Sequence, residues 1–81
     1  MRSKTLKAAV ENFSDVMRAR LEEKERDGFA GWNDPAWHTW DISRRMQQKV
    51  TEVLIAGDNA DPKDLVDIAN FAMFLHRKLA P

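Results

Sequence analysis

With 81 residues the chain is long enough for only one domain, and its hydrophobic fraction of 43% is ordinary for a globular protein. Its 13 basic residues balance its 13 acidic residues, which argues against non-specific binding to nucleic acids. It has no cysteine for disulfides or thiolate metal sites, and no apolar run near the roughly 18 residues that cross a membrane.

A domain of this size has a thin core, because it buries only about 60 to 65% of the surface that its unfolded chain exposes. Association through apolar helix faces is a common way to complete such a core when disulfides are absent. We therefore expect residues 1–81 to form one helical domain that assembles as a homo-oligomer, most simply a twofold dimer. The amino terminus lacks the apolar segment of a signal peptide, so the cytoplasm is the expected compartment.

The first helix is predicted from Lys4 to about Arg26. Its apolar stripe has the three- and four-residue spacing of one helix face and consists of Leu6, Val10, Phe13, Met17 and Leu21. The charged run from Glu22 to Arg26 is interpreted as the solvated end of this helix. Asp27-Gly28 is a suitable stop, because glycine adopts the left-handed conformation that often follows a helix.

An irregular loop is predicted from Gly28 to Trp40, since this segment contains two glycines and one proline. It also holds three tryptophans: Trp32, Trp37 and Trp40. One interpretation is a loop that folds back over the helices and covers the core. The other is an aromatic wall that stacks on the base of a ligand, with Trp32 as the candidate. The two interpretations are compatible if different tryptophans serve each role.

The second helix is predicted from Trp40 or Asp41 to Ala56, and it ends at Gly57. Thr39 or Asp41 is the expected cap, because short polar side chains accept hydrogen bonds from the free amides of the first turn. The apolar stripe of this helix consists of Ile42, Met46, Val50, Val53 and Leu54.

The third helix is predicted from about Asp61 to Ala80, with Asp61 as its cap and Pro62 in its first position. Its stripe consists of Leu65, Ile68, Phe71, Ala72, Leu75 and Leu79. Because only a short turn separates them, the second and third helices are expected to be antiparallel neighbours. The predicted fold class is therefore all-α, with three helices and a tryptophan-rich loop between the first and second.

Two carboxylates lie within the apolar face of the third helix. On a helical wheel Asp67 falls between Phe71 and Phe74, and Asp64 falls between Phe71 and Leu75. A buried carboxylate needs a partner or a metal ion to offset the cost of leaving water. Asp64 also lies in the first turn, where the helix dipole alone favours an acid.

The second helix supplies a set of charged residues that faces these carboxylates. Arg45, Lys49 and Glu52 share one flank, so Glu52 is expected near Asp64 and Asp67 across the antiparallel pair. Three converging carboxylates repel each other unless a cation lies between them, and hard oxygen ligands suit Mg²⁺ or Mn²⁺. The alternative is that Glu52 and Lys49 simply pair with each other on an exposed face.

The segment from Asp64 to Met73, with the sequence DLVDIANFAM, resembles the third-helix motif of phage and bacterial MazG-like proteins, which belong to the all-α nucleoside triphosphate pyrophosphatases. The upstream order is also similar: residues 17–21 precede Gly31-Trp32, and an arginine-led helix follows at Arg44. The resemblance covers about Phe13 to Leu79, and only the third-helix segment is specific.

This resemblance implies a helical dimer that holds Mg²⁺ on an E-x-x-E helix and an E-x-x-D helix and cleaves a nucleoside triphosphate to monophosphate and pyrophosphate. The metal ligands that it implies are Glu52, Asp64 and Asp67. The first glutamate of the family pattern should stand three residues before Glu52, but Lys49 occupies that position. A like charge about 4 Å from a divalent ion costs on the order of 8 kcal/mol at an effective dielectric constant near 20. Lys49 therefore weakens the expected metal site, and it is a candidate to pair with the carboxylates and contact a phosphate itself.

Three functions remain open from the sequence. The first is a MazG-like protein that binds a phosphorylated nucleotide, with degraded or absent hydrolysis, as in a phage protein that sequesters a nucleotide signal or pool. Its candidate ligand contacts are Trp32, Arg45, Lys49 and Asn70. The second is a Mg²⁺-dependent pyrophosphohydrolase whose catalytic residues the sequence does not identify. The third is a helical protein–protein adaptor.

Overall fold

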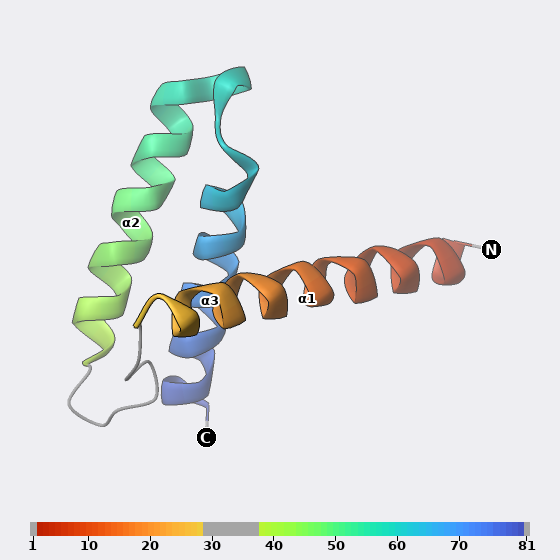
Figure 1. The fold of residues 1–81 in the computed structure, drawn as a ribbon, viewed down its shortest axis with the longest axis horizontal. Coiled ribbons are helices and arrows are strands. Elements are labelled where there is room, and N and C mark those ends of the chain that lie inside the picture. Colours follow the sequence, from red (N-terminus) through yellow and green to blue (C-terminus); the bar gives the residue numbers. More distant parts are fainter. Residues whose placement is uncertain (1, 29–37, 81) are drawn as a thin grey trace.

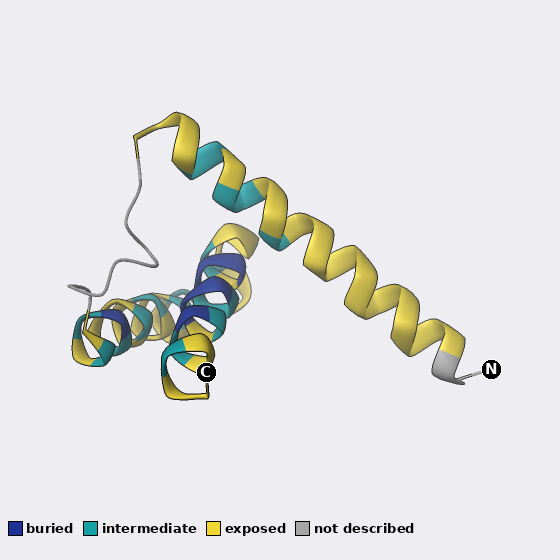
Figure 2. Cartoon of the chain, turned by 90° about the horizontal axis from the view of Figure 1, so that it is seen from below, coloured by how far each residue is buried: buried dark blue, intermediate teal, exposed yellow. Residues whose placement is uncertain are grey.

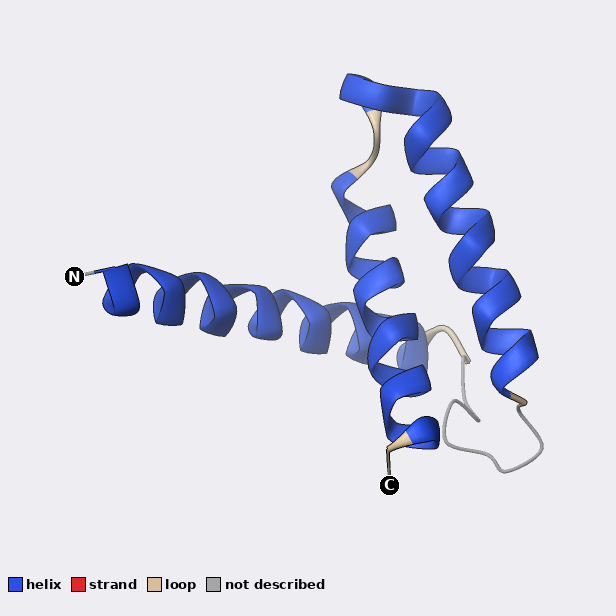
Figure 3. Ribbon diagram, turned by 180° about the vertical axis from the view of Figure 1, so that it is seen from behind, coloured by secondary structure: helices blue, strands red, loops and turns tan. Residues whose placement is uncertain are grey.

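The computed structural model describes residues 2–28 and 38–80, and these ranges contain helices and no strand (Figures 1 and 3). Helix α1 spans Arg2–Arg26, α2 spans Thr39–Ala56 and α3 spans Pro62–Leu79, with a short 3-10 helix η1 at Gly57–Asn59. The predicted all-α class with three helices is confirmed. The tryptophan-rich loop lies mostly outside the described residues, so its two interpretations stay predictions for Trp32 and Trp37. Trp40 lies in α2 with 65% of its surface exposed, so it does not cover the core.

Helices α2 and α3 form the predicted antiparallel hairpin (Figure 1). Gly57 ends α2 with φ 58° and ψ −125°, a conformation that side chains with a Cβ rarely adopt. The Asp61 carboxylate then accepts a hydrogen bond of 2.9 Å from the Lys63 amide, and Pro62 occupies the first turn of α3. Helix α2 begins at Thr39, one residue earlier than expected, after His38.

The core lies between α2 and α3. Its buried members are Ile42, Phe71 and Phe74, and the partly buried residues packed against them are Leu21, Met46, Met73 and Leu75. The Phe71 and Phe74 rings meet edge to face, with centroids 6.3 Å apart and planes at 80°. Such ring pairs add about 0.5 to 1.5 kcal/mol to the stabilisation from burial. Because Phe71 and Phe74 are buried in this core, the face of α3 that also carries Asp67 is turned toward the interior.

Helix α1 crosses α3 with its carboxyl-terminal half only, and its amino-terminal half projects away from the α2–α3 hairpin (Figures 1 and 2). It is one continuous helix through Ser14-Asp15. Every side chain from Lys4 to Val16 is exposed, whereas Met17, Arg20 and Leu21 are partly buried. One end of α1 therefore completes the core, and the side chains of the other end are exposed.

Candidate functional site

Asp67 lies at the centre of the contact between the three helices, with only 3% of its surface exposed. The Arg20 guanidinium of α1 holds it through two hydrogen bonds, from Nε to Oδ1 at 3.0 Å and from Nη2 to Oδ2 at 3.3 Å. Lys24, one turn later on α1, places its Nζ 3.5 Å from Oδ1. The predicted burial of Asp67 is thus confirmed, and the cations that compensate for its burial come largely from α1.

Burial alone would raise the pKa of the Asp67 carboxyl, because the ionised form loses its hydration. The hydrogen bond from Arg20 and the charges of Lys24, Arg20 and Lys49 outweigh this effect, so the pKa lies below its ordinary value. The bond to Asp67 also raises the pKa of Arg20. Asp67 is therefore ionised at neutral pH.

Lys49 of α2 lies where three carboxylates converge. Its Nζ is 3.2 Å from Asp64 Oδ1, 3.7 Å from Glu52 Oε2 and 3.9 Å from Asp67 Oδ2. Burial works against the charged form of Lys49, but its hydrogen bond to Asp64 and the surrounding carboxylates raise its pKa above the ordinary value. The three residues implied as metal ligands are thus brought together, and an ammonium group contacts all of them.

These charged side chains form one connected network, because Arg20 Nη1 also contacts Glu23 Oε1 at 2.9 Å. We define the acidic–basic cluster as Arg20, Glu23, Lys24, Lys49, Glu52, Asp64 and Asp67. Each carboxylate of the cluster has a cationic neighbour within 4 Å. As arranged, the three candidate metal ligands share the Lys49 ammonium. Among residues 2–28 and 38–80, no group of three or more histidine, cysteine or acidic residues has a metal-binding arrangement.

The remaining candidate residues are placed differently. Arg45 lies on an exposed face of α2. Asn70 is 3% exposed and faces α1, where its Nδ2 donates a hydrogen bond of 3.3 Å to the Met17 carbonyl. Trp32 lies outside the described residues. The structure therefore places Lys49 among the carboxylates, and it shows Asn70 linking α3 to α1.

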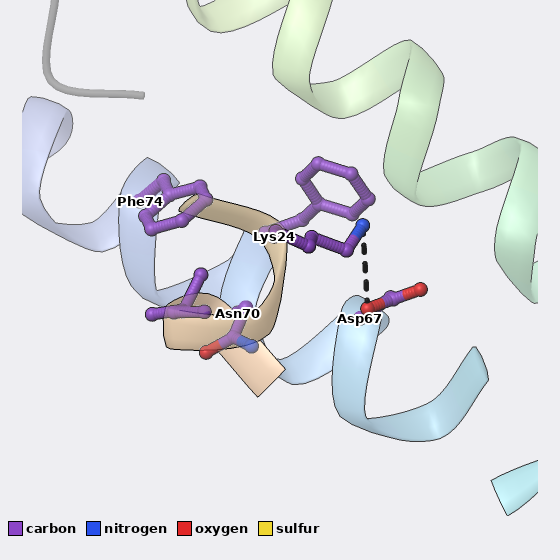
Figure 4. A pocket seen from close by; sticks show the side chains of 6 residues that line it. Lys24, Asp67, Asn70 and Phe74 are labelled. Atoms are coloured by element: carbon purple, nitrogen blue, oxygen red, sulfur yellow. Dashed lines mark ion pairs between the residues drawn. The ribbon is translucent and has the colours of Figure 1, made fainter. Parts of the chain in front are cut away.

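A small cavity adjoins Asp67 between α1 and α3 (Figure 4). It is lined by Leu21, Lys24, Asp67, Asn70, Phe71 and Phe74. Its volume is about 10 Å³, close to the space of one water-sized group. Asn70 Oδ1 is buried and has no hydrogen-bond partner within the described part of the chain. The cavity is thus too small for a nucleotide base. A larger and more open hollow lies along α2 and is lined by Arg44, Gln47, Gln48, Thr51 and Glu52.

No family model matches the sequence, and neither a curated protein nor a solved structure matches the chain. None of the described helices combines the length and the apolar character needed to cross a membrane.

Sequence reasoning missed Arg20 and Lys24. The prediction that residues 22–26 form a solvated end is wrong for Lys24, whose side chain is 26% exposed and contacts Asp67. A signal was present, because Arg20 and Lys24 continue the spacing of the apolar stripe of α1 at i and i+4. Cations within an apolar face indicate a buried acidic partner.

Proposed function

We propose that this protein is a divergent MazG-like helical protein, of the phage type, that binds a phosphorylated nucleotide between α2 and α3 and has degraded or absent hydrolysis. Sequestration of a nucleotide signal or pool would fit such an activity. The observation that carries the proposal is the position of Lys49, whose Nζ lies within 4 Å of Glu52, Asp64 and Asp67.

An ammonium group at the point where the three carboxylates converge limits the chemistry that these residues can perform. A divalent ion activates water and polarises a phosphoryl group, whereas an ammonium group of one positive charge does neither to a comparable degree. An ammonium group does donate up to three hydrogen bonds and binds phosphate oxygens as a point charge. The Lys49 side chain is 32% exposed, so its long stem can turn from the carboxylates toward a ligand on the open side.

Thermal unfolding in the presence of nucleotides tests this proposal. We expect at least one nucleoside triphosphate or cyclic oligonucleotide, at a hundredfold excess over its Kd, to stabilise the protein by about 2.7 kcal/mol, which raises Tm by about 10 °C or more. Lys49→Gln should lose most of this shift. Lys7→Gln is the matched control, because Lys7 is 79% exposed on the projecting half of α1. Equal shifts in both variants, or none in the wild type with any nucleotide, would contradict the proposal.

The Lys49→Glu substitution separates a binding protein from a decayed enzyme. It restores the family's carboxylate at position 49, so four carboxylates would then surround the point where Lys49 Nζ lies. If Lys49 only replaced a metal ligand, Mg²⁺ should stabilise Lys49→Glu and not the wild type. If Lys49 has been recruited to hold the nucleotide, Lys49→Glu should lose nucleotide binding. Release of pyrophosphate from deoxynucleoside triphosphates by the wild type with Mg²⁺ or Mn²⁺ would instead support the pyrophosphohydrolase.

A helical protein–protein adaptor is the second candidate, and the exposed apolar side chains of α1 favour it. Leu6 is 67% exposed and Val10 is 59% exposed, although both belong to the apolar stripe. We also propose that the chain is a homo-oligomer under either function. A Tm that neither nucleotides nor metal ions change would favour the adaptor.

A further inference from the structure

The side-chain amide of Asn70 has a partner for its nitrogen and none for its oxygen. Asn70 is 3% exposed, and its Nδ2 donates a hydrogen bond of 3.3 Å to the Met17 carbonyl. A carbonyl oxygen only accepts hydrogen bonds, so the nitrogen of the amide must face Met17. Asn70 Oδ1 is buried without a hydrogen-bond partner among residues 2–28 and 38–80. Because nearly all buried polar atoms in native proteins are paired, this oxygen indicates a partner from outside these residues.

The cavity beside Asn70 has the size and the lining of a site for one small molecule. Its volume of about 10 Å³ admits a single water-sized group. Three polar side chains, those of Lys24, Asp67 and Asn70, line it together with the apolar groups of Leu21, Phe71 and Phe74 (Figure 4). A buried water makes about three hydrogen bonds in a typical protein. The polar groups around the cavity are therefore as many as one water requires.

The charges around the cavity determine which small ligand it accepts. A cation would be repelled by the Lys24 ammonium, and the Asp67 carboxylate is already paired with Arg20 at 3.0 Å and with Lys24 at 3.5 Å. An anion would be repelled by the Asp67 carboxylate and by the lone pairs of Asn70 Oδ1. An apolar molecule would leave Asn70 Oδ1 unpaired after the loss of its hydration. A neutral hydrogen-bond donor of the size of water meets all of these conditions.

We propose that one water molecule is bound in this cavity as an integral part of the contact between α1 and α3. The water donates hydrogen bonds to Asn70 Oδ1 and to the Asp67 carboxylate, whose oxygens offer about four acceptor positions. It accepts a hydrogen bond from the Lys24 ammonium, which has several N–H donors. The water thus links two turns of α3 to the end of α1, beside the direct bond from Asn70 to Met17. The site depends neither on nucleotide binding nor on assembly.

A high-resolution crystal structure of the wild-type protein tests the site directly and needs no substitution. We expect density for one water about 2.8 Å from Asn70 Oδ1, within hydrogen-bond distance of Asp67 and Lys24. A direct hydrogen bond from Lys24 Nζ to Asn70 Oδ1, with no density between them, would overturn the proposal. An ion at this point would overturn the assignment to a neutral donor.

Oxygen-17 relaxation dispersion of the solvent gives a second measurement, because it detects waters that stay bound for longer than the protein takes to tumble. Asn70→Leu keeps the approximate size of the side chain and removes the acceptor, so it should lower the dispersion amplitude by about one water per chain. Asn59→Leu is the matched control, since Asn59 is exposed in η1 and does not line the cavity. Equal amplitudes in the wild type and Asn70→Leu, or equal losses in both variants, would contradict the proposal. If Asn70→Leu does not fold, the crystal structure of the wild type still decides.

Discussion

Asp67 shows how a single buried charge links the three helices. Its carboxylate is reached by Arg20 and Lys24 from α1 and by Lys49 from α2, so it requires all three helices to be in place. An unpaired carboxylate at this depth would strongly destabilise the folded protein, because the ionised group would lose its hydration without gaining a partner. The cluster thus specifies how α1 crosses α3, independently of any ligand.

Substitution of Asp67 by Asn should therefore destabilise the protein. We expect a loss of about 2 to 3 kcal/mol in the free energy of unfolding, less than for a fully enclosed pair because Arg20 and Lys24 retain some access to water. Glu52→Gln is the control, and it should cost less than about 1 kcal/mol because the Glu52 side chain is 49% exposed. Urea unfolding monitored by circular dichroism measures both values. Equal losses in the two variants would argue against a central role for Asp67.

The lowered pKa of Asp67 predicts a loss of stability in acid. A carboxyl with a pKa lower in the folded than in the unfolded protein stabilises the fold fully above the unfolded value of about 3.9, and this contribution disappears as pH falls through the folded value. For Lys49 the sign is reversed, so its contribution is complete below the unfolded pKa of about 10.4 and is lost at higher pH. Asp67→Asn should show a shallower fall in unfolding free energy below pH 4 than the wild type. Parallel curves would contradict the assignment.

At the scale of the helices, local sequence signals predicted the α2–α3 arrangement more completely than they predicted the contacts within the acidic–basic cluster. The Asp61-Pro62 start and the short turn after Gly57 were sufficient to predict the α2–α3 hairpin, because these signals are local. The position of α1 was not predictable in this way, since a long connection does not fix where a helix packs. The contact of Arg20 with Asp67 spans 47 positions along the chain and has no local signal beyond its place on an apolar face.

The cap of α3 provides a test at this scale. Asp61→Ala should remove the hydrogen bond to the Lys63 amide and cost about 1 kcal/mol of unfolding free energy. Asp61→Ser should retain most of that free energy, because the serine hydroxyl also accepts from the first-turn amides. Thermal or urea unfolding of the two variants gives the comparison. A difference near zero between Asp61→Ala and Asp61→Ser would show that the cap contributes little to the start of α3.

For the whole molecule, the two halves of α1 differ. The projecting half carries the exposed apolar side chains of Leu6 and Val10, whereas the other half contributes Arg20, Glu23 and Lys24 to the acidic–basic cluster. The side chains of the projecting half of α1 are exposed, while Arg20 and Lys24 tie the other half to α3 (Figure 2). Substitutions of Leu6 or Val10 should leave the cluster intact, and Lys49→Gln should leave the exposed face of α1 intact, so the two halves can be tested separately.

The most direct test of the role of Lys49 is a phosphorus-31 NMR time course of deoxynucleoside triphosphates with the wild-type protein and Mg²⁺. The account predicts that the resonances of at least one nucleotide broaden or shift on binding, while no pyrophosphate or monophosphate accumulates. Stoichiometric release of pyrophosphate and monophosphate would contradict it and identify an active pyrophosphohydrolase. Spectra of the deoxynucleoside triphosphates and of cyclic oligonucleotides that the protein leaves unchanged would contradict nucleotide binding.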